Sequence, residues 1–223
     1  MSINIIKSAL NNKKNLDCLF KSRTDAAVKM AEYASAYELF YETLIYIPFG
    51  GIPLRDVFIL HRNGIDCLAF PVVKIPSKFE SRFGIGAINI LGKPLINNYI
   101  IKMLEEGTIN ENIDIALKKQ QVIMKKLCFA FPQKNQLEQK HIMIVDDGLS
   151  SGYTLLATLD SIYNIAMPKV INCLIPVAHI EGIRKIRQRF TDVNIFSLYI
   201  DNSSVFLIDE YYKDFSEITI INK

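Results

Sequence analysis

The sequence predicts an α/β fold in which a parallel, twisted sheet carries helices on both faces. Three observations lead to this prediction. Short apolar runs, typical of strands that are buried on both faces, recur along the chain. Segments with helical periodicity separate these runs, as the crossovers of a parallel sheet require. Half of the 223 residues are hydrophobic, which is enough for a sizeable core.

The individual elements follow from local composition. A strand is expected where an apolar, β-branched run ends at a turn, and a helix where apolar residues recur at a spacing of three and four. Gly50-Gly51 ends the first strand, and Asn63-Gly64 ends the helix that follows it. Strands are expected at residues 43–48, 67–73, 142–145, 170–177 and 193–200, and helices over the first forty residues and at 54–62, 154–163 and 181–190.

Residues 74–140 break this alternation. Residues 74–82 are polar, residues 84–92 alternate apolar residues with glycines as in a hairpin arm, and residues 110–127 have the pattern of a long amphipathic helix. Insertions on α/β sheets often cover the ligand crevice at the carboxyl ends of the strands. We therefore expect a single domain over residues 1–223, with an inserted arm and helical segment at about 74–140.

Bulk composition excludes several classes of protein. The net charge of +3 is too small to indicate nucleic-acid binding, and the basic cluster at 184–189 is interpreted as a solvated helix face. Cys18, Cys67, Cys128 and Cys173 have no metal-ligand spacing, and three of them lie in apolar stretches where a thiol is usually buried. The sequence shows neither a membrane span nor a signal peptide, so a cytoplasmic protein without a membrane partner is expected.

The most informative segment is residues 142–154. Its apolar strand delivers Asp146 and Asp147 to the carboxyl end, and a loop with two glycines and two serines leads into a helix near Thr154. Unpaired amides and the dipole at a helix start favour phosphate. Ionised carboxylates suit a ribose diol or Mg²⁺ beside that phosphate. The segment therefore predicts a ribose phosphate site, and the alternative is a glycine-rich turn that the two acids merely cap.

This segment resembles the motif of type I phosphoribosyltransferases that binds phosphoribosyl pyrophosphate (PRPP). In that motif a hydrophobic strand precedes two acidic residues and a loop of the pattern Gly-X-X-Thr/Ser-Gly-X-Thr. The resemblance implies that Asp146 and Asp147 contact the ribose hydroxyls and Mg²⁺, and that residues 150–154 surround the 5′-phosphate. It implies PRPP contacts for Asp146, Asp147, Gly148, Leu149, Ser150, Ser151, Gly152, Tyr153 and Thr154.

The resemblance covers roughly residues 20–218. Residues 47–53, Ile-Pro-Phe-Gly-Gly-Ile-Pro, resemble the Pro-Arg-Gly-Gly-Val-Pro loop of bacterial and archaeal predicted phosphoribosyltransferases with unassigned substrates. Residues 23–26 resemble that family's Arg-X-Asp-Ala, and residues 211–215 its Trp-Tyr-X-Asp-Phe. The resemblance implies the type I phosphoribosyltransferase fold, with a hood over the site.

The expected pyrophosphate loop comprises Phe49, Gly50 and Gly51. The two glycines would turn backbone amides toward pyrophosphate as an anion-binding nest, and an ordinary tight turn is the alternative. Lys74 is expected at a strand end at the same sheet edge, where its ammonium would meet developing negative charge. Phe49 and Val73, however, stand where the resembled family has arginines, so two bidentate phosphate contacts are missing.

The implied activity is Mg²⁺-dependent transfer of the 5-phosphoribosyl group from PRPP to a nitrogen acceptor such as a nucleobase, with release of pyrophosphate. Asp146, Asp147 and Lys74 are the expected catalytic residues, and Phe206 is expected to stack on a planar acceptor. The rival interpretation is a regulatory protein that binds PRPP or a nucleotide without turnover, motivated by the two missing arginines. The identity of the acceptor and the oligomeric state, a homodimer included, stay open.

Overall fold

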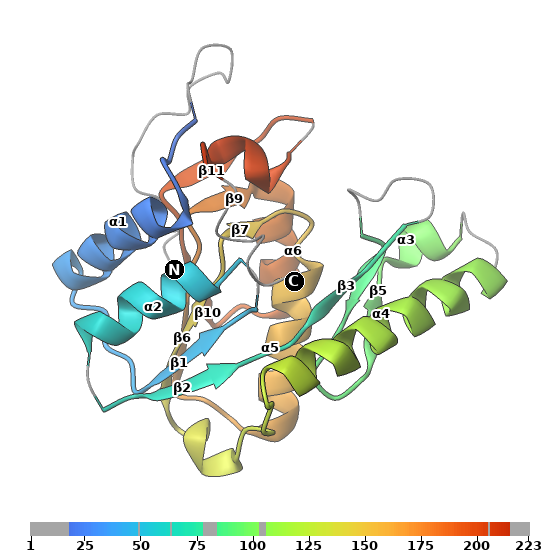
Figure 1. Cartoon of the computed structure of the whole chain (residues 1–223), viewed down its shortest axis with the longest axis horizontal. Helices are drawn as coiled ribbons and strands as arrows, with labels where there is room; N and C mark the ends of the chain where they lie inside the picture. The colour runs from blue at the N-terminus through green and yellow to red at the C-terminus, as the bar shows by residue number, and fades with distance from the viewer. Residues whose placement is uncertain are drawn as a thin grey trace.

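The centre of the molecule is a five-stranded parallel sheet with the strand order β10-β8-β6-β1-β2 (Figure 1). The computed structural model describes residues 18–48, 50–62, 64–77, 84–102, 106–204 and 206–214. The sheet strands are β1 (Thr43–Tyr46), β2 (Asp66–Ala69), β6 (His141–Val145), β8 (Val170–Leu174) and β10 (Val193–Phe196). The predicted α/β class with a parallel sheet is confirmed.

Helices cover both faces of this sheet. Alternate residues of β6 point to opposite sides, as the strand period of two requires: Met143 and Val145 face one apolar cluster, and Ile142 and Ile144 face another. The first cluster includes residues of α1 (Arg23–Ala36) and α2 (Ile52–His61), and the second includes residues of α5 (Tyr153–Ile165) and α6 (Ile180–Arg189). The strands are therefore buried on both faces, which explains their continuous apolar runs.

A second, smaller sheet continues the strands beyond a break. It comprises β7 (Gly148–Leu149), β9 (Val177–His179) and β11 (Tyr199–Asp201), all parallel. The expected strands at 170–177 and 193–200 were each too long, because each divides between the two sheets. Pro176 marks the break: it has no amide hydrogen for a ladder, and its carbonyl accepts hydrogen bonds from the amides of Leu198 and Tyr199.

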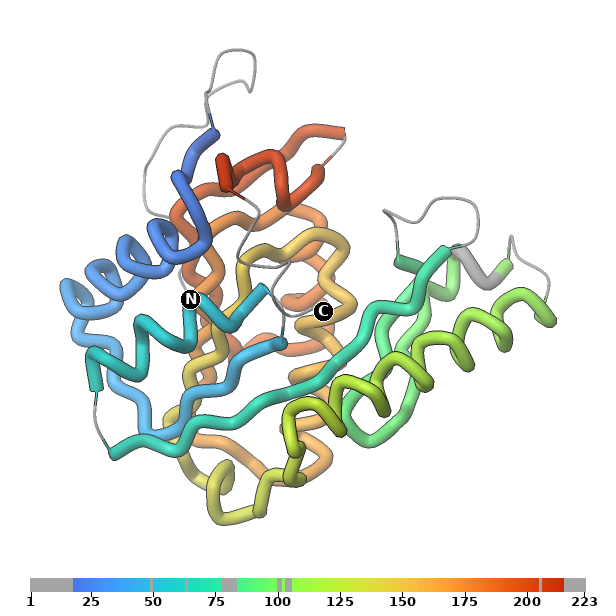
Figure 2. Tube along the Cα trace, in the orientation of Figure 1, coloured from blue at the N-terminus to red at the C-terminus, as the bar shows by residue number. Residues whose placement is uncertain are grey.

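Residues 73–126 contain an arm that stands beside the sheet (Figures 1 and 2). Its antiparallel strands are β3 (Val73–Ile75), β4 (Gly86–Ile88) and β5 (Pro94–Ile96), and it also carries α3 (Asn98–Ile101) and α4 (Glu106–Lys126). The strand expected at 67–73 was too long: β2 ends at Ala69, after which the chain leaves the central sheet and enters the arm at β3. Beyond the arm, a short 3₁₀ turn, η2 (Lys134–Gln136), precedes β6.

Buried amide side chains fix the arm to the helix that follows the acid pair. The Gln120 side chain on α4 donates to the carbonyl oxygens of Pro71 and Asn89, at 2.8 Å each. The Asn89 amide in turn donates to Asp160 on α5 at 2.9 Å. The hydroxyl of Ser161, also on α5, accepts from the backbone amide of Ile90. Because these polar groups are buried and paired, the arm is held at a fixed position beside α5.

The two ends of the described chain lie side by side. The backbone amide of Phe20 donates to Tyr211, and the amide of Lys213 donates back to Phe20. The rings of Phe20 and Tyr212 stack with their centroids 5.6 Å apart. We call residues 19–22 together with 206–214, which include the 3₁₀ turn η3 (Ile208–Tyr211), the roof.

Three features of the described chain bear on the sequence predictions. The helix expected over the first forty residues is present at 23–36, and residues 1–17 lie outside the described residues. Of the four cysteines only Cys173 is buried, so the burial expected for three of them holds for one; Cys67, for instance, lies in the edge strand β2. Within the described ranges, no helix has the length and apolar character needed to cross a bilayer.

Candidate active site

A cavity of about 470 Å³ opens at the carboxyl ends of β1 and β6. Its size is that of a small-molecule site, and its position is the one that ligands favour on an α/β sheet. Three parts of the molecule line it: the loops after the central strands, the arm with α4, and the roof. The cavity brings together the following predicted site residues: Gly50, Lys74, Asp146, Asp147, Gly148, Leu149, Ser150, Ser151, Gly152 and Thr154.

Asp146 and Asp147 follow β6 directly and form the floor of the cavity. They are nearly buried, with 9% and 8% of their surface exposed, and the amide of Asp147 donates to the Asp146 carboxylate at 3.0 Å. Burial, together with the negative charge of Asp147, raises the pKa of Asp146 well above its ordinary value. Asp146 is therefore a carboxylate that a cation or a set of hydroxyl donors would stabilise.

Asp147 has a different environment from its neighbour. Nε of Arg23 donates to its carboxylate at 2.6 Å, and the Tyr212 hydroxyl donates to its backbone carbonyl at 2.5 Å. Gly50 lies so close that a Cβ there would stand 2.1 Å from an Asp147 carboxylate oxygen. The sequence prediction treated the two acids alike and missed Arg23, although the Arg-X-Asp-Ala resemblance includes that residue without giving its role.

The loop between the acids and α5 has the geometry of a phosphate site. Gly152, the N-cap of α5, has a φ of 86°, a left-handed conformation that glycine adopts without strain. The amides in the first turn of α5 have no partner within the helix, so they can donate to an anion that also gains from the helix dipole. Ser150, Ser151 and Thr154 line the cavity around this helix start.

Helix α6 supports this loop from behind. Gly182 allows a close approach, because a Cβ there would lie 2.2 Å from the carbonyl oxygen of Ser150. Nζ of Lys185 donates to the carbonyl oxygen of Ser151 at 2.8 Å and lies 4.1 Å from the centre of the Tyr153 ring. Lys185 was interpreted from the sequence as part of a solvated face, and that interpretation was wrong: it is half-buried, and burial lowers its pKa. The Tyr153 ring is turned toward α6 and does not line the cavity.

A family model of the phosphoribosyl transferase domain matches residues 101–214, just over half of the chain and a range that includes the acid pair and the phosphate loop. The chain belongs to the phosphoribosyl transferase domain family. The membership predicted from the sequence motif is thereby confirmed.

Solved structures agree with this domain's fold. The protein TT1426 from Thermus thermophilus is similar with a TM-score of 0.64 at 19% identity, over 91% of this chain and 96% of that chain. The AQ2163 protein from Aquifex aeolicus is similar with a TM-score of 0.53 at 14% identity, over 86% of this chain and 83% of that chain. No curated protein sequence matches the chain.

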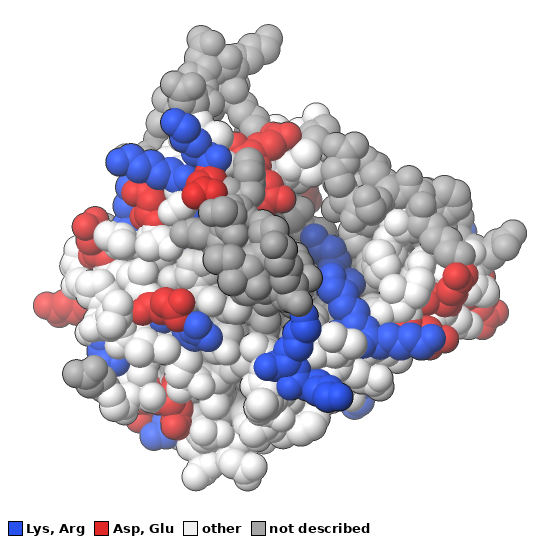
Figure 3. All heavy atoms as spheres, viewed as in Figure 1, with Lys and Arg blue, Asp and Glu red and all other residues white. Residues whose placement is uncertain are grey.

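The arm of this phosphoribosyl transferase domain contributes two lysines to the cavity, Lys74 and Lys119. Lys74 was expected at the end of a central strand, but it lies within β3 of the arm. Its aliphatic stem lies against Gly84, where a Cβ would be 2.4 Å from Cγ of Lys74. Lys119 projects from α4, and Figure 3 shows Lys and Arg side chains along the hollow between that helix and the sheet. The sequence alone did not identify Lys119, since the helical pattern does not reveal which face meets the cavity.

Of the residues of the expected pyrophosphate loop that the structure describes, only Gly50 is among the residues that line the cavity. Gly50 lines the cavity, whereas the amide of Gly51 donates to the carbonyl oxygen of Ile47 at 2.9 Å and so serves the turn itself. A Cβ at Gly51 would lie 2.6 Å from that same oxygen, so the turn requires glycine here. Phe49 lies outside the described residues.

Phe206 does not occupy the position that was expected for an acceptor-stacking ring. Only 6% of its surface is exposed, and its ring packs between His179 and Tyr211, with centroid distances of 5.3 Å to each. The prediction was wrong about its position because this aromatic side chain belongs to the core of the roof. Two neighbouring roof residues, Ile208 and Asp209, line the cavity instead.

The acid pair fits the coordination chemistry of Mg²⁺. This ion is commonly held by one or two carboxylates together with substrate phosphate oxygens, and it keeps several waters. Asp146 offers a buried carboxylate beside a place suited to phosphate, and Asp147 offers Oδ1, the oxygen that is not bonded to Nε of Arg23. Among the described side chains, no cluster of three or more His, Cys, Asp or Glu residues could hold a metal by itself. A bound Mg²⁺ would therefore share its shell with the substrate.

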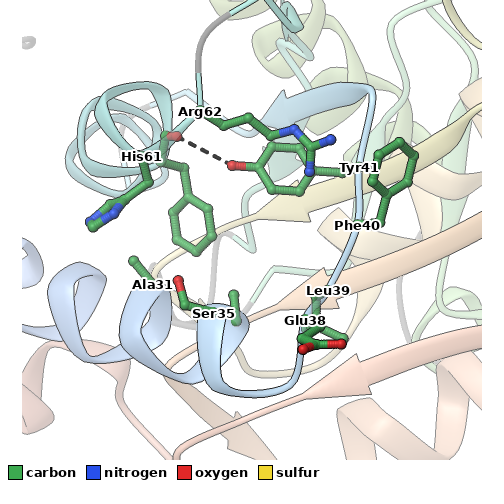
Figure 4. Close-up of a pocket in the computed structure, with 10 residues that line it drawn as sticks. Ala31, Ser35, Glu38, Leu39, Phe40, Tyr41, His61 and Arg62 are labelled. Atoms are coloured by element: carbon green, nitrogen blue, oxygen red, sulfur yellow. Dashed lines mark hydrogen bonds between the residues drawn. The ribbon is translucent and has the colours of Figure 1, made fainter.

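A second hollow, of about 260 Å³, lies at the amino ends of β1 and β2 (Figure 4). The guanidinium of Arg62 stacks over the rings of Phe40 and Tyr41, at 4.3 and 5.1 Å. The Tyr41 hydroxyl donates to the backbone carbonyl of Phe58 at 3.3 Å. Because its aromatic faces already hold an internal cation, this hollow is less suited to a charged ligand than the cavity that contains the acid pair.

Proposed function

We propose that this phosphoribosyl transferase domain moves the 5-phosphoribosyl group of PRPP to a nitrogen acceptor, such as a nucleobase, and releases pyrophosphate. One observation carries the proposal: a single cavity combines a buried acid pair, the amide-rich start of α5 and two lysines from the arm. These three features are complementary to the three parts of PRPP, namely its ribose, its 5′-phosphate and its pyrophosphate.

Each of the three parts of PRPP would bind a different part of the cavity wall. The 5′-phosphate would bind the loop at residues 150–154, where the unpaired amides of the first turn of α5 and three hydroxyls converge. The ribose hydroxyls would donate to Asp146, and to Oδ1 of Asp147, the oxygen that is not bonded to Nε of Arg23. The pyrophosphate would then lie toward Gly50 and the two lysines of the arm.

The transfer needs charge stabilisation more than it needs proton chemistry. The bond between C1 of the ribose and the pyrophosphate oxygen breaks, and its electron pair leaves with pyrophosphate. The acceptor nitrogen forms the new bond to C1 and releases its proton to solvent. Lys74 and Lys119 would stabilise the departing anion, while the carboxylates would stabilise the positive charge that develops on the ribose. Bound Mg²⁺ would neutralise part of the charge on pyrophosphate.

The two arginines missing from the family pattern bear on turnover. Val73 is buried, so position 73 contributes no side chain to the cavity wall. Lys119 supports turnover nonetheless, because it adds a cation to that side of the cavity. Binding of PRPP or a nucleotide without transfer is the second candidate, and the substitutions at Phe49 and Val73 are the observations that favour it.

Product analysis with labelled PRPP separates the two candidates. The native protein would be incubated with PRPP, Mg²⁺ and a panel of nucleobases, and both pyrophosphate and labelled nucleotide would be measured. We expect stoichiometric pyrophosphate and nucleotide with at least one base, loss of both in Asp146→Asn, and no change in Asp56→Asn, which alters an exposed carboxylate on α2. PRPP binding without product from any base would replace the transfer proposal with the binding one.

A further inference from the structure

Arg23 is a buried cation at an unfavourable position in the fold. It is the first residue of α1, where the helix dipole disfavours positive charge, and only 1% of its surface is exposed. Burying a guanidinium is costly unless carboxylates or other acceptors surround it. A purely structural role in α1 would be served better by an apolar side chain, so the contacts of Arg23 indicate what the residue does.

Those contacts join two walls of the cavity. Nε of Arg23 donates to the Asp147 carboxylate, and its Nη2 donates to Asp209, both at 2.6 Å. Its guanidinium also lies 4.5 Å from the centre of the Tyr212 ring, and the Tyr212 hydroxyl donates to the backbone carbonyl of Asp147. Asp147 belongs to the expected ribose site, whereas Asp209 and Tyr212 belong to the roof.

We infer that Arg23 is a positioning residue that fixes Asp147 beside the ribose and ties it to Asp209 in the roof. The inference rests on the proposed function, in which Asp147 faces the ribose of PRPP. Arg23 itself is absent from the residues that line the cavity, so it acts through the two carboxylates it holds.

The geometry leaves Asp147 in one orientation. Arg23 holds one carboxylate oxygen, Oδ2, and the carboxylate lies so close to Gly50 that a Cβ at that position would be 2.1 Å from Oδ1. Asp146 is held in a different way: it accepts from the backbone amide of Asp147, its side chain also pairs with the Asp147 side chain, and the charge of Lys74 acts on it. Arg23 thus holds one acid of the pair directly and reaches the other only through it, which favours a reactive ribose geometry.

Asp209 is coupled to Asp147 through the guanidinium of Arg23. Its side chain is 68% exposed and lines the cavity while it is bonded to Arg23. Because one guanidinium holds both carboxylates, a change in the position of Asp209 alters the support of Asp147. Arg23 therefore sets the spacing between the roof and the ribose site.

A double-mutant cycle on ligand binding tests this inference. Calorimetry would measure the affinity for PRPP with Mg²⁺, and separately for inorganic phosphate, in the native protein, Arg23→Gln, Asp147→Asn and the double variant. We expect each single change to weaken PRPP binding about ten-fold, and the double change to weaken it hardly further, because both remove one interaction. Affinity for inorganic phosphate should stay within about two-fold, since Arg23 bonds to Asp147 and Asp209, which are not part of the loop at 150–154.

Two further variants serve as controls for the double-mutant cycle. Arg23→Lys keeps the charge but can reach only one carboxylate well, so it should restore part of the lost PRPP affinity. Lys29→Gln breaks an exposed ion pair with Asp25 on the same helix and should leave both affinities unchanged. If Arg23→Gln fails to fold, Arg23→Lys with native PRPP affinity would overturn the inference, and PRPP affinity reduced without loss of phosphate affinity would support it.

The outcomes also separate this inference from the proposed function. Independent, multiplicative effects of the Arg23 and Asp147 changes in a native protein that binds PRPP would overturn the positioning role alone. A native protein that binds phosphate but not PRPP would overturn the proposed function first, and the inference with it. Binding of PRPP without pyrophosphate release would remove the transfer step and leave the binding cycle as the test of Arg23.

Discussion

Adjacent carboxylates in this site have opposite environments. Asp147 accepts from a buried guanidinium, whereas burial and the charge of Asp147 raise the pKa of Asp146 well above its ordinary value of 3.8. A carboxyl group that is destabilised in the empty protein is typical of a ligand site, since a cation or hydroxyl donors can relieve it on binding. Because the raised pKa of Asp146 reflects an unfavourable negative charge in the folded protein, removing that charge should change the stability of the ligand-free protein.

Asp146→Asn should stabilise the ligand-free protein and abolish PRPP binding. Between pH 3.8 and the raised pKa, the folded protein keeps a proton that the unfolded chain has lost, so the free energy of unfolding falls as pH rises. Asparagine has no such titration. The melting temperature of the variant should therefore exceed that of the native protein at pH 8 in the absence of metal, with a smaller difference at pH 5. Equal melting temperatures at both values would show that Asp146 is not destabilised in the empty site.

The loop that joins β6 to α5 was predicted well from the sequence because all of its signals are local. The apolar strand, the acid pair, the glycines and the helix start occur within about fifteen consecutive residues, and the structure retains their order. The support of that loop could not be predicted, because Gly182 and Lys185 come from a different helix. The same reason explains why Arg23 was missed: it lies 124 positions from the carboxylate it holds.

At the scale of elements, α6 should determine the shape of the phosphate loop. Replacing glycine by alanine inside a helix normally stabilises a protein by about 0.5–1 kcal/mol. Gly182→Ala should do the opposite and weaken phosphate binding about ten-fold or more, because its Cβ would meet the Ser150 carbonyl oxygen at 2.2 Å. Gly107→Ala in α4, where a Cβ would meet nothing within 4 Å, is the matched control and should stabilise the protein. Urea denaturation and phosphate titration of both variants would check this. If Gly182→Ala and Gly107→Ala changed stability and phosphate affinity to the same extent, α6 would not determine the shape of the loop.

The arm should contribute to pyrophosphate more than to the ribose 5-phosphate half of PRPP. Lys119→Ala and Lys74→Ala should each weaken pyrophosphate binding about ten-fold, the usual effect of one charge-assisted contact, and ribose 5-phosphate binding much less. Lys118→Ala is the matched control, because that exposed neighbour on α4 does not line the cavity. If these variants lost the same affinity for pyrophosphate and for ribose 5-phosphate, the lysines would attract anions in general and would not contact pyrophosphate specifically.

Across the whole molecule, the cavity exists because three distant segments converge on one sheet edge. The central strands supply the acid pair, the arm supplies cations, and the roof closes the wall with Ile208 and Asp209. The fold class followed from periodicity, but convergence of this kind depends on tertiary packing. This is why the sequence put Lys74 on the wrong strand and Phe206 in the acceptor site.

A crystal structure with PRPP and Mg²⁺ would decide whether this cavity is a PRPP site. We expect the 5′-phosphate against residues 150–154, the ribose hydroxyls within hydrogen-bond distance of Asp146, and the pyrophosphate between Gly50 and the lysines of the arm. The Arg23 contact to Asp147 should persist in that complex. A phosphate group anywhere other than the start of α5, or a ribose turned away from the acid pair, would contradict the proposed site.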